Sequence, residues 1–342
     1  MYALIKALFF CALLLQALTL IFLFERKFDM TRIFIDGSEG TTGLRIYERF
    51  DKRDDIELIR IDPDKRKDPE ERKKMINFSD ITFLCLPDAA SEESVSLIEN
   101  PDVKIIDTST AHRTLDDWTY GYPELKGQRE KIKNSKRIAV PGCYATGFIT
   151  IVRPLIEEGI LPKDYPVSSF AVSGYSGAGK KAIAVYEGAD KPYEFNSPRE
   201  YALSQQHKHL KEMKKITGLS DTPLFSPIVD DYYSGMFVSV PLYTKLLNKN
   251  AGMNEIHDMF SEYFKGEKFI KIMPLGAESE SNGFIGANKC SDWDGLELFV
   301  TGNEERVVVT TRFDNLGKGA SGAAIQVLNI LLGCDEAKGL NL

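Results

Sequence analysis

The sequence predicts an α/β protein in which a doubly wound parallel-sheet domain is followed by an α+β domain with a mostly antiparallel sheet. Two observations predict this class. Strand-like and helix-like segments alternate from Ile33 to Cys143, which is typical of a parallel sheet with crossover helices. Beyond Thr146, strand-like runs outnumber helical ones, which is typical of an α+β domain. A chain of 342 residues, 43% of them apolar, has enough material for two hydrophobic cores.

Charge and cysteine usage narrow the class of protein. The net charge of -7 gives no support for nucleic-acid binding, which normally shows as a basic domain. The five cysteines are widely spread and include no CxxC pair. We therefore expect neither a metal site nor a disulfide framework, and a reducing compartment such as the cytoplasm.

An apolar leader, residues 1–29, precedes the predicted domains. Ala7–Phe24 contains eighteen residues without a charge, which is the lower limit for a membrane-spanning helix and also resembles a signal-peptide core. No clear small-x-small cleavage site follows. The preferred interpretation is that translation begins at Met30, where a strand starts almost at once. A membrane-tethered form is expected only if the leader is real.

The first domain opens with a strand, a glycine-rich turn and a helix. The strand is predicted at 33–35 and the helix at 44–50, and the turn between them has GxxGxxG spacing. Such glycines let the backbone approach a pyrophosphate at a helix N-terminus, so the turn indicates dinucleotide binding. Its candidate cofactor-binding residues are Gly37, Gly40, Thr41, Thr42 and Gly43.

Further strands are predicted at 56–61, 81–86 and 103–106, with a helix from about 88 to 98. After the second strand, Asp62 lies where an acidic residue would bind the ribose of NAD. The adjacent Lys65 and Arg66 offer the opposite charge and suit the 2′-phosphate of NADP. A solvated loop is the simpler alternative, and the residues alone leave the three open.

Cys143 is the most informative single residue. It follows a short strand-like run, 138–141, and opens a helix predicted over 145–158. A thiol among the free amides of a helix N-terminus has a lowered pKa and is a better nucleophile. The alternative is a small buried thiol, which describes most free cysteines.

Other polar segments carry groups that a core or a turn does not need. Arg113 follows the strand that ends near Asp107, and it suits a carboxylate or phosphate; a surface arginine is the alternative. His207 and His209 precede a helix and suit proton transfer, although two histidines on a surface helix more often have no role. Ser173–Lys180 is a glycine-serine turn that offers amides to an anion, or a plain connection.

The second domain is predicted to contain six strands and three helices, followed by a final helix over 319–332. The strands are expected at 168–172, 237–241, 269–272, 284–288, 296–301 and 307–311. The helices are expected at 176–189, 206–217 and 254–263. The alanine- and glycine-rich final helix is suited to close packing on a flat surface.

In combination, these segments resemble one family. The runs PGCYATG (141–147), SGYSGAGK (173–180) and DNLGKGASGAA (314–324) match the motifs of the N-acetyl-γ-glutamyl-phosphate reductases. DTSTAHR (107–113) and YGYPEL (120–125) are similar to the shorter of that family's two subtypes. The resemblance extends from Met30 almost to the C-terminus, and residues 1–29 have no counterpart in it.

The resemblance implies a fold like that of glyceraldehyde-phosphate and aspartate-semialdehyde dehydrogenases. A Rossmann-type NADP-binding domain, 30–143, is completed by the C-terminal segment 319–342. A catalytic and oligomerisation domain, 144–318, implies a homodimer or homotetramer. The implied activity is the NADPH-dependent reduction of N-acetylglutamyl phosphate to the semialdehyde in arginine biosynthesis, with release of phosphate.

Residue roles follow from the resemblance in the same way. Cys143 is the implied nucleophile, and one of His207 and His209 is the implied acid and base. Arg113, assisted by Ser109, is the candidate for binding the substrate. The implied cofactor-binding residues of the second domain are Ser173, Gly174, Ser176, Gly177 and Asn315.

Two alternatives stay open at this stage. An aspartate-semialdehyde dehydrogenase would use the same cysteine chemistry on a shorter substrate, and the segment Tyr120–Leu125 argues against it. A non-catalytic dinucleotide-binding protein would retain only the fold. The intact cysteine, the HxH segment and the SGYSGAGK turn argue against that second alternative.

Overall fold

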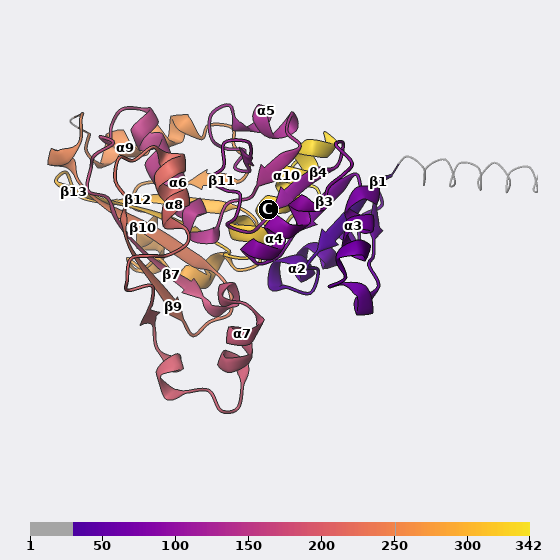
Figure 1. Cartoon of the computed structure of the whole chain (residues 1–342). Coiled ribbons are helices and arrows are strands. Elements are labelled where there is room, and N and C mark those ends of the chain that lie inside the picture. The colour runs from indigo at the N-terminus through magenta and orange to yellow at the C-terminus, as the bar shows by residue number, and fades with distance from the viewer. Residues whose placement is uncertain (1–29, 250) are drawn as a thin grey trace, which may run out of the picture.

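The computed structural model describes residues 30–249 and 251–342, and the predicted leader lies outside them. Two lobes, each built on one sheet, form the body of the molecule (Figure 1). None of the helices in the described ranges combines the length and the apolar character that crossing a membrane requires.

The first lobe contains six parallel strands in the order β2-β1-β3-β4-β6-β5. The strands are β1 (Thr31–Asp36), β2 (Ile56–Ile59), β3 (Ile81–Leu84), β4 (Lys104–Asp107), β5 (Thr119–Tyr120) and β6 (Arg137–Ala139). The helices are α2 (Thr41–Phe50), α3 (Pro69–Phe78), α4 (Asp88–Ser96) and α5 (Gln128–Lys133). The chain runs to opposite sides of β1, so a crevice opens at the carboxyl ends of β1 and β3.

Both faces of this sheet are covered, as a doubly wound sheet requires. One face packs with Ile46 and Phe50 of α2, and the other packs with Ile76 of α3. The predicted parallel strands are confirmed. Helix α2 begins at Thr41, three residues before the first apolar position that set the predicted start, because Gly40 already takes the extended N-cap conformation.

The C-terminal helix α10 (Gly322–Leu332) packs against the first sheet rather than the second. Its Ala324 and Leu328 share a buried cluster with Ile33 and Ile138. A π-helical turn, Gly317–Ser321, leads into α10 directly from the last strand of the second sheet. The chain therefore crosses between the lobes twice, once before Cys143 and once after that strand.

The second sheet has seven strands in the order β11-β12-β13-β10-β7-β9-β8. The strands are β7 (Ser168–Gly174), β8 (Arg199–Glu200), β9 (Leu224–Asp230), β10 (Met236–Tyr243), β11 (Ile270–Ile272), β12 (Leu296–Gly302) and β13 (Arg306–Phe313). The helices are α6 (Cys143–Glu157), α7 (Lys180–Glu187), α8 (Leu210–Thr217) and α9 (Met253–Tyr263). The β7–β9 and β11–β12 pairs are parallel and the others are antiparallel, which confirms a mostly antiparallel sheet.

Predictions for several elements of this lobe need correction. Helix α7 begins at Lys180 rather than 176, because a 3₁₀ turn (Tyr175–Ala178) and Gly179, with φ of 84°, precede it. The strand at 284–288 is wrong: a 3₁₀ turn (Ala287–Cys290) lies there, and Phe284 is 75% exposed and so adds little to the core. Strand β9 was not predicted, because Pro227 within it has no backbone N–H to donate and interrupts the strand-like sequence pattern. Helix α8 begins at Leu210 rather than 206, because a turn with positive φ at Ala202 and Gln205 precedes it.

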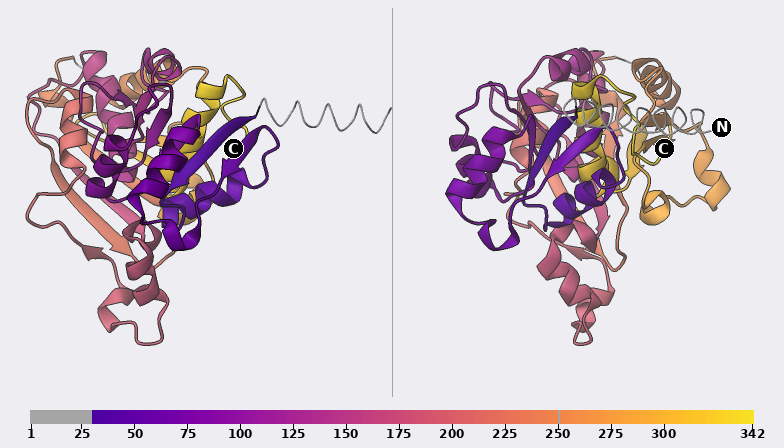
Figure 2. Two further views of the ribbon diagram at one scale, coloured as in Figure 1. Left: turned by 45° about the vertical axis from the view of Figure 1, so that its right-hand side comes forward. Right: turned by 90° about the vertical axis from the view of Figure 1, so that its right-hand side faces the viewer.

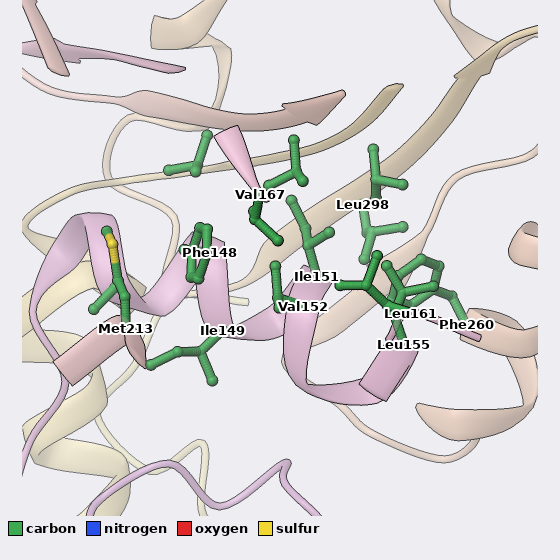
Figure 3. Close-up of a cluster of buried hydrophobic side chains, with 14 of the residues drawn as sticks. Phe148, Ile149, Ile151, Val152, Leu155, Leu161, Val167, Met213, Phe260 and Leu298 are labelled. Carbon is green, nitrogen blue, oxygen red and sulfur yellow. The ribbon is translucent and has the colours of Figure 1, made fainter. Parts of the chain in front are cut away.

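Helix α6 anchors the second lobe. Phe148, Val152 and Leu155 of α6 are fully buried, in one cluster with Met213 of α8 and Phe260 of α9 (Figure 3). A helix held this firmly fixes the position of its first residue, Cys143. By contrast, α7 and the chain after it project away from the body (Figures 1 and 2).

The core of α6 provides the first prediction. Phe148→Ala removes a fully buried ring, and we expect it to lower the free energy of unfolding by about 3–5 kcal/mol. Phe284→Ala, at a ring that is 75% exposed, is the matched control, with an expected change of about 0.5 kcal/mol or less. Urea denaturation followed by circular dichroism measures both. Equal losses in the two variants would contradict the assigned core.

Candidate active site

A cavity of about 440 Å³ lies at the junction of the two lobes. Thr41, Thr42 and Thr108 line it from the first sheet's loops, and Tyr144 and Tyr201 line it from the second lobe. Of the residues with predicted roles, the lining includes Arg113, Cys143, Ser173, Gly174, Gly177, His207, His209 and Asn315. The fold thus brings residues separated by almost three hundred positions to one space.

Cys143 lies at the start of a helix, as the sequence predicts, although α6 begins at Cys143 itself, two residues before the predicted start; Gly142 before it is extended. The predicted lowering of its pKa is wrong. Burial raises the pKa of the Cys143 thiol, and this effect outweighs the opposing amide of Tyr144 and the positive charges of Arg113 and Lys208. In the free protein the thiol is therefore mainly protonated at neutral pH, and it needs a base to act as a nucleophile.

His207 and His209 both line the cavity, and their ring centroids are 4.7 Å apart. His209 lies beside the thiol's own turn, since a Cβ placed on Gly142 would lie 2.4 Å from its Nε2. The backbone N–H of His209 donates to His207 Nδ1 over 3.1 Å. Of the two candidates for the acid and base, His209 is therefore the one that the structure places beside the turn that carries Cys143.

Both histidines are neutral at physiological pH. Burial, reinforced by the charge of Arg113, places the pKa of His209 well below the usual range. Burial lowers the pKa of His207 to about 4. A neutral imidazole can accept a proton, so this site holds two candidate bases next to a protonated thiol.

Arg113 is buried, and most of its donors are engaged. Its Nε donates to the carbonyl of Val140 over 2.8 Å, and Nη2 donates to that of Thr108 over 2.7 Å. Its Nη1 donates to Glu212 over 3.1 Å. Its guanidinium is therefore fixed in the cavity wall, with two of its five N–H groups left for a ligand.

Glu212 is the functional residue that sequence reasoning missed. Its buried carboxylate accepts bonds from the Tyr120 hydroxyl over 2.6 Å and the Gly142 amide over 2.9 Å, besides the one from Arg113. The sequence offered only a weak signal for Glu212. It lies three positions after His209 and is therefore on the same face of the predicted helix. Nothing local showed that this face is buried.

Ser109 lies behind the cavity wall rather than in it. Its hydroxyl donates to Asp107 over 2.7 Å, and Asp107 also contacts His112 Nδ1 at 2.6 Å. Ser109 is buried and is absent from the cavity lining. Ser109 therefore stabilises the loop that carries Arg113 and does not face the cavity.

The glycine turn is packed closely against its own backbone and the end of β3. Gly37 has φ of 89°, and a Cβ there would lie 2.4 Å from the carbonyl oxygen of Cys85. A Cβ on Gly43 would lie 2.4 Å from the carbonyl oxygen of Gly37. Gly40 caps α2, whose first residues Thr41 and Thr42 face the cavity. A hollow of about 310 Å³, lined by Ser38, Leu58 and Pro63 among others, adjoins the turn.

The second-lobe turn faces the same cavity. Ser173, Gly174 and Gly177 line it, whereas Ser176 is buried and accepts a bond from Asn315 Nδ2 over 2.9 Å. Asn315 Oδ1 accepts from the Gly235 amide over 2.9 Å. Within residues 30–249 and 251–342, no group of three or more His, Cys, Asp or Glu is placed to hold a metal ion.

Comparisons with known proteins identify two family domains in the chain. Residues 16–135 match the semialdehyde dehydrogenase NAD binding domain, and residues 143–315 match the semialdehyde dehydrogenase dimerisation domain. The N-acetyl-γ-glutamyl-phosphate reductase 2 of Nostoc sp. is 47% identical over 321 residues, covering 90% of this chain and 99% of the relative. The N-acetyl-γ-glutamyl-phosphate reductase of Brucella ovis is 45% identical over 307 residues, covering 88% of this chain and 99% of the relative.

Solved structures show the same fold at low identity. An aspartate semialdehyde dehydrogenase from Francisella tularensis superposes with a TM-score of 0.68 and 15% identity, covering 89% of this chain and all of that one. Aspartate semialdehyde dehydrogenase II from Vibrio cholerae superposes with a TM-score of 0.66 at 15% identity. The match covers 89% of this chain and 98% of that one.

The raised thiol pKa predicts how Cys143 reacts in the free protein. Since burial raises this pKa, the thiolate fraction rises with pH, and we expect iodoacetamide to label Cys143 faster with each step from about pH 7 to pH 9. Peptide mass spectrometry separates Cys143 from the other cysteines, and Cys143→Ser provides the blank. A labelling rate that is already constant at pH 6–7 would contradict a protonated resting thiol.

Proposed function

The chain belongs to the N-acetyl-γ-glutamyl-phosphate reductase family of semialdehyde dehydrogenases, and we propose that it reduces N-acetylglutamyl phosphate to N-acetylglutamate semialdehyde for arginine biosynthesis. One observation carries the proposal beyond family membership. Cys143, the neutral His209 and the fixed Arg113 line one cavity, and Thr41 and Thr42, which follow the glycine turn, line it too. A nucleophile, a base and an anion-binding cation are the groups that acyl-phosphate reduction requires.

In the first step His209 accepts the proton of the Cys143 thiol. The sulfur attacks the acyl carbon, and the bond to the phosphate oxygen breaks, so that phosphate leaves with the electron pair and takes the proton from His209. The product on the protein is a thioester at Cys143. Because the thiol pKa is raised, this step depends on the neighbouring base.

The negative oxygen that forms at the acyl carbon lies near the start of α6. The first amides of a helix have no acceptor within the helix, so those at the start of α6 are available to donate to this oxygen. Each such donor is worth about 3 kcal/mol of transition-state stabilisation.

When bound, the reduced nicotinamide supplies the hydride that converts the thioester to a hemithioacetal. The hemithioacetal then releases the aldehyde as the carbon–sulfur bond breaks and its electrons return to sulfur. His209 carries a proton from solvent to the Cys143 thiolate, which restores the resting thiol. Gly319 leaves room beside the sulfur, since a Cβ there would lie 2.9 Å from the Cys143 Cβ.

We propose NADP as the cofactor. Arg66 forms an ion pair with Glu39, so its guanidinium lies beside the glycine turn, where a 2′-phosphate would compete with Glu39 for it. Asp62 is exposed and accepts a hydrogen bond from the Asp64 amide over 3.0 Å, which directs its carboxylate to its own turn. This arrangement supports 2′-phosphate recognition better than a ribose hydroxyl contact.

We also propose a homodimer or homotetramer in the cytoplasm. The register places Phe170, Leu224 and Tyr243 on one face of the second sheet, and each is at least 40% exposed. An apolar face of this kind supports self-association. Four free cysteines, Cys85, Cys143, Cys290 and Cys334, support a reducing location.

The activity test runs the reaction in reverse. We expect reduction of NADP⁺ by N-acetylglutamate semialdehyde to require phosphate and to vanish in Cys143→Ser. His209→Asn is expected to lower kcat about 10²–10⁴-fold, while the neighbouring His207→Asn lowers it about tenfold or less. Activity with aspartate semialdehyde instead would assign the sister reaction. No activity from folded protein that binds NADPH would support a non-catalytic role.

The cofactor proposal has its own test. Arg66→Ala is expected to lower the ratio of kcat/KM for NADPH to that for NADH about tenfold, because a charge partner of the 2′-phosphate is lost. Lys67→Ala removes a neighbouring charge and is the matched control, with an expected change of about twofold or less. A preference for NADH in the unaltered protein would contradict the proposal directly.

A further inference from the structure

A second cavity, of about 620 Å³, adjoins the first. The two share Arg113, His207 and Lys208 in their linings, so these side chains form the partition between them. The residues of the glycine turn, the Ser173–Lys180 turn and the segment around Asn315 do not line the second cavity. A ligand in the second cavity therefore avoids the surfaces that face the cofactor.

Lys208 is the cation in this partition that is free to bind. Its side chain is exposed, and within residues 30–249 and 251–342 no hydrogen bond or ion pair engages its ammonium group. Arg113 differs, because three acceptors already hold its guanidinium. An ammonium group offers three donors and a compact charge, which suits a phosphate.

The charge of Lys208 acts in both cavities. In the first cavity it partly offsets the rise that burial causes in the pKa of Cys143. In the second it adds to the hydrogen bonds from Thr110 that lower the pKa of Asp88. Asp88 and Glu92 offset the charges of Lys208 and Lys211 in the lining of the second cavity, so a phosphate can pass through it without being held firmly. A phosphate held by Lys208 would thus lie within reach of the nucleophile and of a second opening.

The proposed reaction needs such a route. After the acyl group is transferred to Cys143, phosphate must leave while the cofactor occupies the first cavity, and in the reverse direction phosphate must enter while the thioester and cofactor are in place. We propose that Lys208 binds the phosphoryl group and that the second cavity is the passage for inorganic phosphate. This inference rests on the proposed function and adds to it a phosphate-binding residue and a route.

The test measures phosphate kinetics in the reverse reaction. Lys208→Met is expected to raise the KM for phosphate about tenfold or more, with the KM for the semialdehyde changed about threefold or less, and Lys208→Arg is expected to restore most of the phosphate affinity. Lys214, on α8, lines neither cavity, so Lys214→Met, which also removes one lysine charge, is the matched control. A raised KM for the semialdehyde with an unchanged KM for phosphate would overturn the assignment.

The passage is tested separately from the binding residue. Ala111 lines only the second cavity, and Ala111→Trp is expected to lower kcat/KM for phosphate about tenfold while leaving NADP⁺ affinity unchanged. Unchanged phosphate kinetics in this variant would overturn the passage.

A binding measurement keeps failure of this inference distinct from failure of the proposed function. Broadening of the ³¹P NMR line of inorganic phosphate by the protein needs no turnover. We expect the broadening in the unaltered protein and in Lys214→Met, and its loss in Lys208→Met. Equal broadening in all three would overturn the role of Lys208 whether or not the protein turns over the semialdehyde. If the broadening depends on Lys208 but the protein shows no phosphate-dependent turnover, only the proposed reaction is contradicted.

Discussion

The site depends on the hydrogen bonds that the buried carboxylate of Glu212 accepts. Glu212 is 2% exposed and accepts bonds from Arg113, Tyr120 and the Gly142 amide, so it ties α8 both to the first lobe and to the turn before Cys143. Removing one partner of a buried ion pair costs about 3–5 kcal/mol, because the remaining charge loses its compensation. The histidines before α8 thus keep a fixed position relative to the turn that carries Cys143.

A second buried network supports the same junction from the C-terminal side. Lys318, in the π-helical turn, donates to Glu124 and to Gln326, each over 2.6 Å, and is 1% exposed. This holds the turn in which Gly319 lies against Cys143. The nucleophile is therefore enclosed by segments from the middle and the end of the chain, and neither lobe alone would complete the site.

Local signals explain what the sequence could predict. The glycine turn, the parallel strands and the start of α6 at Cys143 each depend on residues close together in the chain, and these predictions agree with the structure. The strand at 284–288 failed because an apolar run does not reveal whether anything packs against it. Glu212 and the raised pKa of Cys143 depend on burial between distant segments, which spacing along the chain cannot show.

Transfer of the acyl group to Cys143 is the step on which the proposed reaction depends. It is measured most directly by mixing the protein with N-acetylglutamyl phosphate in the absence of a nicotinamide cofactor and determining the intact mass after acid quenching. We expect one N-acetylglutamyl group per chain, mapped by peptide mass spectrometry to Cys143 and absent from Cys143→Ser. An adduct on another residue, or full turnover with no acylation of Cys143 at any time, would contradict it.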